Sequence, residues 1–114
     1  MGVIWRGLAA SVCMVLGGCI PRETPRIGAI DPSNNIPAIQ EAARNGDSKA
    51  IPALVQQLDS DDSAVRFYAI EALQKLTGQT LGYQFYDSAK LRKEEVARWQ
   101  RWVKDQQGKA GMNQ

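Results

Sequence analysis

Apolar residues recur at helical spacing in four successive segments, and no segment alternates apolar and polar residues as a half-buried strand would. Asn35 is the predicted cap of the first helix, and Gly46 stops it after Asn45. Thr77 and Gly78 end the third helix. The pattern thus predicts an all-α domain over residues 36–104, with helices at 36–45, 47–58, 63–76 and 88–104.

The segments on either side of this domain lack such a period. Residues 19–35 contain three prolines, a glycine and scattered polar residues, which predicts a flexible linker rather than a folded element. Residues 105–114 show no apolar periodicity, which predicts a disordered tail.

The N-terminus has the pattern of a signal peptide. Arg6 precedes an uncharged run from Gly7 to Leu16, which is too short to span a bilayer as a helix. The segment Leu16-Gly17-Gly18-Cys19 resembles the lipobox of bacterial lipoproteins, whereas Cys13 follows the β-branched Val12 and does not fit. The resemblance implies a cleaved peptide over residues 1–18 and a lipid on Cys19. The alternative is an ordinary cleavage site with an incidental cysteine.

Ile20 follows the cysteine, and by resemblance to envelope sorting in double-membrane bacteria this residue favours the outer membrane. We therefore expect a lipid-anchored protein of the bacterial cell envelope that faces the periplasm. The expected membrane attachment is through Cys19.

Composition excludes several classes of function. The 14 basic and 12 acidic residues give a net charge of only +2, which argues against a nucleic-acid partner. There is no histidine, and both cysteines lie before residue 20. The folded part therefore offers no imidazole base, thiol nucleophile, disulfide or zinc-type site, and we predict no catalytic, metal or cofactor-binding residue.

Residues 47–76 resemble a bacterial HEAT-like repeat of the phycobilisome-lyase type. The matching features are Pro52 in the first helix, an acidic turn at 59–62, Val65-Arg66 at the start of the second helix, and small residues at Ala69 and Ala72. The match is weaker over 36–45. The resemblance implies a short α-α solenoid of about four helices, and it says little about function.

The aromatic residues near the C-terminus have two interpretations. Trp99, Trp102 and Tyr83 are the predicted structural cap, because a solenoid of few repeats needs extra apolar area to close its end. The alternative is an aromatic pocket for a ligand.

Phe67 and Ile70 lie off the main apolar stripe of their helix. They are either an exposed interaction patch or residues that pack under the loop at 81–86.

Together these features predict a lipid-anchored protein–protein interaction or scaffolding module, without enzymatic activity, whose protein partner the sequence does not identify. The alternative is an accessory lipoprotein that binds a small molecule or peptide through its aromatic C-terminal region.

Overall fold

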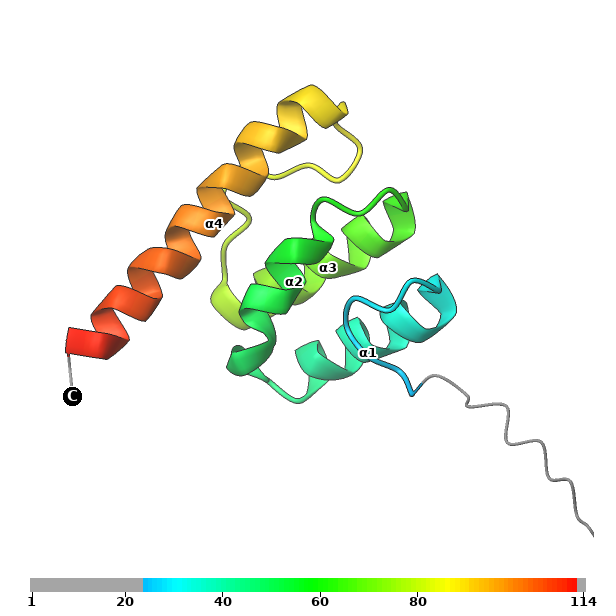
Figure 1. Cartoon of the computed structure of the whole chain (residues 1–114), viewed down its shortest axis with the longest axis horizontal. Helices are drawn as coiled ribbons and strands as arrows, with labels where there is room; N and C mark the ends of the chain where they lie inside the picture. Colours follow the sequence, from blue (N-terminus) through cyan, green and yellow to red (C-terminus); the bar gives the residue numbers. More distant parts are fainter. Residues whose placement is uncertain (1–23, 113–114) are drawn as a thin grey trace, which may run out of the picture.

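The computed structural model describes residues 24–112, and within this range the chain is helical and contains no strand. The all-α prediction is confirmed. The predicted signal peptide and Cys19 lie outside the described residues. The elements, shown in Figure 1, are α1 (Pro32–Arg44), the 3-10 turn η1 (Ser48–Ala50), α2 (Ile51–Gln57), α3 (Ser63–Thr77) and α4 (Ala89–Met112).

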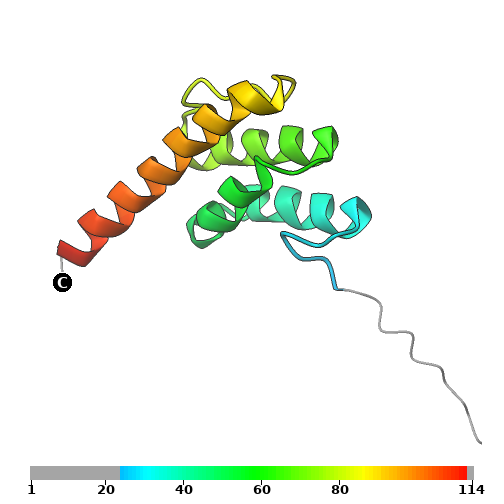
Figure 2. The ribbon, with the colours of Figure 1, turned by 45° about the horizontal axis from the view of Figure 1, so that its top comes forward.

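The helices are arranged in two layers. α1 and α3 lie side by side and run in the same direction, while α2 packs on α3 and also on α4 (Figures 1 and 2). α2 and α3 therefore form one complete helical hairpin. α1 adds a single helix beside α3, and α4 adds a single helix beside α2.

α1 begins four residues earlier than the sequence predicted, so the predicted boundary between linker and domain is wrong. Asp31, not Asn35, is the N-cap: its carboxylate accepts a 2.9 Å hydrogen bond from the Ser33 amide, and Pro32 occupies the first helical position. The bonds from Ser33 lower the pKa of Asp31. Asn35 is inside the helix and buried.

The end of the predicted linker is folded against the domain. The Oδ1 of Asn35 accepts a 2.9 Å hydrogen bond from the Gly28 amide, and its Nδ2 donates a 2.8 Å bond to Gln57 in α2. Ala29 is buried beside this bridge. These contacts satisfy a buried amide side chain, which explains why the chain is ordered here despite its linker-like composition.

The central hairpin follows its local signals. Asp47 accepts a bond from the Lys49 amide and starts η1, and Pro52, which has no N–H to donate, follows in the first turn of α2. Asp62 accepts bonds from the Ala64 and Val65 amides and starts α3. Gly78, with a φ of 74°, ends α3 in the left-handed conformation that favours glycine.

α4 continues to Met112, so the prediction of a disordered tail from residue 105 is wrong for residues 105–112. Adding residues to an existing helix needs no new nucleus, and the glutamine, lysine and alanine residues of the segment favour helix, whereas Gly108 and Gly111 disfavour it. Its residues from 104 to 111 are exposed. The tail therefore projects as a helix without a core-facing stripe.

The core lies between the two layers. All four α-helices contribute to its largest fully buried side chains, and Leu58 is the C-cap of α2. These side chains are Ile39, Leu54, Leu58, Val65, Leu73 and Trp99. Small residues at Ala42, Ala69 and Ala72 allow the helix backbones to approach.

Candidate interaction surface

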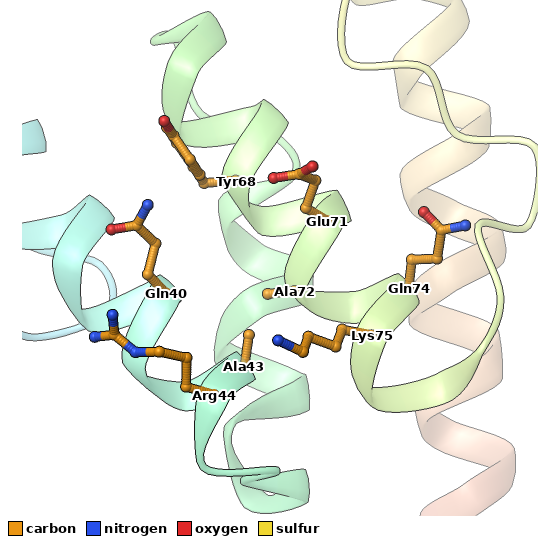
Figure 3. A pocket seen from close by; sticks show the side chains of 8 residues that line it. All are labelled: Gln40, Ala43, Arg44, Tyr68, Glu71, Ala72, Gln74 and Lys75. Carbon is orange, nitrogen blue, oxygen red and sulfur yellow. The ribbon is translucent and has the colours of Figure 1, made fainter.

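A groove of about 450 Å³ lies between α1 and α3 (Figure 3). Ala43 and Ala72 lie between the two helices, and their short side chains leave the space open. No residue of α2 or α4 lines the groove. The other lining residues are mostly polar and exposed: Gln40 and Arg44 from α1, and Tyr68, Glu71, Gln74 and Lys75 from α3.

A row of aromatic rings leads away from this groove. Tyr68 contacts Phe67 edge-to-face with ring centroids 5.2 Å apart, Phe67 contacts Phe85 at 5.1 Å, and Phe85 contacts Tyr86 at 5.2 Å. The row passes from α3 to the loop before α4. Its last ring, Tyr86, is 68% exposed, so the row ends in exposed apolar area, and of its four rings only Tyr68 lines the groove.

Arg66 fixes the loop that carries Phe85. Arg66 is 9% exposed, its Nε donates a 3.0 Å hydrogen bond to the carbonyl of Phe85, and its Nη1 donates a 2.7 Å bond to the carbonyl of Ser60. One buried side chain thus joins the α2–α3 turn to the α3–α4 loop. Its charge is compensated by two carbonyl oxygens.

Glu95 holds the same loop from the other side. Glu95 is buried and accepts a 3.3 Å hydrogen bond from the Gln84 amide. Burial, followed by a hydrogen bond with the side chain of Asp87, raises the pKa of the Glu95 carboxyl.

Of the three residues predicted as a structural cap, Trp99 and Tyr83 are buried and Trp102 is partly buried. Trp99 is fully buried, and its Nε1 donates a 2.9 Å hydrogen bond to the carbonyl of Thr80. Tyr83 is 5% exposed, and its hydroxyl donates a 2.6 Å bond to the carbonyl of Leu58. Trp102 is half-buried, 5.6 Å from the Trp99 ring. Trp99 and Tyr83 have no surface free for a ligand, whereas Trp102 does.

The environment of Tyr83 predicts a specific response to alkaline pH. Burial raises the pKa of Tyr83 to about 12, whereas an unfolded tyrosine ionises near pH 10. The contribution of this group to stability is present below about pH 10 and is lost as pH rises towards about 12. In an absorbance titration of tyrosinate, one phenol of the three should ionise late, and Tyr83→Phe should remove that late phase. A late phase that survives in Tyr83→Phe would contradict the assignment.

Of the two residues in the predicted interaction patch, Ile70 does not fit the exposed interpretation, whereas Phe67 is partly exposed. Ile70 is 8% exposed and belongs to the core, because α3 turns this position towards the helices it packs on. Phe67 is partly exposed and packs on Phe85, within the 81–86 loop. The alternative of packing under the loop therefore describes Phe67, which also belongs to the aromatic row.

Within residues 24–112, no group of three or more acidic, histidine or cysteine side chains is placed to hold a metal ion. In the same part of the chain, no helix combines the length and the apolar character needed to cross a bilayer. Cys19, the predicted lipid attachment site, is outside the part that the structure describes.

The groove residues were not singled out from the sequence. Gln40, Ala43 and Arg44 share one face of α1 by their i, i+3, i+4 spacing, and Tyr68, Ala72 and Lys75 share one face of α3. Each face is mixed in polarity, and mixed faces usually indicate plain solvent exposure. Only the packing of α1 along α3 brings the two faces to one groove.

Comparison with protein families matches residues 26–99 to HEAT repeats. No curated protein and no solved structure gives a significant match to the chain. The matched region includes α1, the complete hairpin of α2 and α3, and the start of α4, which agrees with the two-layer packing described above. The chain belongs to the HEAT-repeat family.

Proposed function

We propose that this chain is a lipid-anchored protein–protein interaction module of the bacterial cell envelope, and that it binds its partner on the α1–α3 groove. HEAT-repeat solenoids present extended surfaces to other proteins, and the family is typically non-enzymatic. The observation that carries the proposal is the hollow of about 450 Å³ between two parallel helices, which is bordered by exposed side chains.

Site-specific crosslinking tests the location of this surface. A photo-crosslinking amino acid replaces Gln40 at the groove or, as a matched control, Gln100 on the α2–α4 side of the molecule; both glutamines are exposed. In cells, crosslinked adducts should form from position 40 and not from position 100. Equal adducts at both positions, or none at position 40, would argue against the groove as the partner site.

The anchor is the second element of the proposal. The nine residues from Cys19 to Ile27, where the chain begins to contact the core, can span at most about 32 Å when fully extended. Because residues from Ile27 onward contact the domain, the tether is shorter than the linker over residues 19–35 that the sequence predicts. A lipid on Cys19 would keep the domain close to the membrane surface, where a cysteine carrying two or more acyl chains is held stably.

Processing at Cys19 gives a direct prediction. Cys19→Ser should abolish fatty-acid labelling, and inhibition of lipoprotein signal peptidase should accumulate the precursor, because the thiol of Cys19 is the proposed acceptor of the lipid. Cys13→Ser is the matched control and should retain full labelling. Labelling that persists in Cys19→Ser, or a mature N-terminus elsewhere, would remove the anchor from the proposal.

A second candidate function rests on Trp102. A hollow of about 510 Å³ lies between the start of α2 and the second half of α4, and its lining includes Ile51, Pro52, Trp102, Val103 and Ala110. A small apolar molecule or peptide bound there would change the fluorescence of Trp102. Trp102→Phe should remove that response. A ligand response with no crosslinks at the groove would favour this accessory role over the scaffold.

A further inference from the structure

The α1–α3 groove differs in charge between its two ends. Arg44 lies in the last turn of α1 and Lys75 in the last turn of α3. Because the two helices run side by side in the same direction, their C-terminal ends meet at one end of the groove (Figures 1 and 2). Both cationic side chains are exposed there and line the groove.

Two cations and one carboxylate, that of Glu71, line the groove. Figure 3 shows Glu71 pointing away from Arg44 and Lys75, towards the end of the groove at Tyr68. A basic residue near a helix C-terminus is favourable for its own helix. The two side chains place two positive charges at one end of the groove, and both would attract an anion bound there.

The opposite end of the groove is apolar at its edge. Tyr68 lines the groove and is also the first ring of the aromatic row Tyr68–Phe67–Phe85–Tyr86. Ala43 and Ala72 lie between the two helices, and their short side chains leave room for a peptide segment. The surface thus offers aromatic contacts at one end and paired cations at the other.

We propose that the groove binds an acidic peptide segment of a partner protein, with a carboxylate between Arg44 and Lys75 and an aromatic or aliphatic side chain against Tyr68. This inference rests on the proposed interaction function and specifies the chemistry of the partner. The carboxylate forms charge-assisted hydrogen bonds with the guanidinium and the ammonium. The apolar side chain packs on Tyr68, which is the ring of the aromatic row that lines the groove.

Peptide titration tests the charge preference. The detergent-solubilised mature chain is titrated against two fluorescent peptides of equal length, one alternating glutamate with tyrosine and one alternating lysine with tyrosine. The acidic peptide should bind more tightly, and the preference should weaken as salt is raised. Arg44→Glu and Lys75→Glu should each weaken its binding about fivefold, because each replaces an attraction by a repulsion at an exposed site.

Lys104→Glu, an exposed lysine on α4, is the matched control and makes the same change in net charge far from the groove. It should leave the affinity for the acidic peptide within about twofold of the parent. Glu71→Gln should strengthen binding of the acidic peptide, and Ala43→Leu, which fills the groove, should abolish it. Circular dichroism confirms that each variant remains helical.

The proposal is overturned if the lysine peptide binds as tightly as the acidic one, if neither binds, or if Lys104→Glu weakens binding as much as Lys75→Glu. Crosslinking from position 40 separates this failure from failure of the proposed function. Adducts that persist in Arg44→Glu and Lys75→Glu would keep the groove as a partner site and reject the acidic partner. Loss of adducts in the parent chain would reject both.

Discussion

Trp99→Ala is expected to lower the free energy of unfolding by about 3–5 kcal/mol, the usual cost of truncating a fully buried aromatic residue. The ring is completely buried and lies between α4 and the rest of the core. The substitution also leaves the carbonyl of Thr80 without its donor. A domain of this size is stable by about 5–10 kcal/mol, so the change should remove much of the total stability. Thermal and urea unfolding followed by circular dichroism measures it.

Two companion variants keep this prediction testable if Trp99→Ala does not fold. Trp99→Phe retains most of the apolar volume and loses the hydrogen bond to Thr80, so it should cost about 1–2 kcal/mol. Trp102→Ala should cost less than Trp99→Ala, because Trp102 is only half-buried. A near-neutral Trp99→Ala would show that α4 contributes little to the fold.

The accuracy of the sequence prediction differs between the two ends of the domain. α3 was predicted to within one residue, because Asp62 and Gly78 mark its ends by local chemistry. The start of α1 was missed although Asp31 and Pro32 are themselves capping signals. Prolines and a glycine before them indicated a linker. The segment is ordered by hydrogen bonds from Gly28 to Asn35 and from Asn35 to Gln57, and the second of these bonds spans 22 residues.

The end of α4 was missed for the opposite reason. Residues 105–112 lack an apolar stripe, and the absence of a stripe predicts no packing rather than no helix. The helix continues from a packed segment that contains Trp99 and Val96. The period of apolar residues therefore located the core-facing part of α4 and not its end.

The groove cannot be predicted from the sequence of α1 or of α3 alone, because residues of both helices line it. The faces of α1 and α3 that line it are both polar enough to indicate exposure to solvent. Whether Arg44 and Lys75 reach the same groove depends on the relative rotation and direction of two helices separated by the whole of α2. For the same reason the sequence left Phe67 between two interpretations, which its contact with Phe85 decides.

Arg66 illustrates how a resemblance can identify a residue without explaining it. An arginine after Val65 was part of the repeat pattern, but its partners lie in two separate turns. A guanidinium has several donors in a fixed plane, so it can bind two carbonyls at once, which the ammonium of lysine on a flexible stem cannot do as well. The position therefore favours arginine.

Arg66→Met is expected to lower the free energy of unfolding by about 2–4 kcal/mol, because two hydrogen bonds from a charged donor are lost together. Methionine keeps the apolar stem of the side chain, so the loss isolates the bonds to the carbonyls of Ser60 and Phe85. Arg66→Lys should fall between the parent and Arg66→Met. Urea unfolding measures each stability, and amide hydrogen exchange should become faster in the loop that carries Phe85.

The control for Arg66→Met is Arg101→Met, since Arg101 is exposed on α4 and its replacement should change stability by no more than about 0.5 kcal/mol. Equal stability of Arg66→Met and Arg101→Met would mean that the two carbonyls find other donors when the guanidinium is removed. Faster exchange in the loop with unchanged global stability would instead limit Arg66 to ordering the loop. Because Phe85 belongs to the aromatic row, Arg66→Met should also weaken partner crosslinking at position 40 if the row contributes to binding.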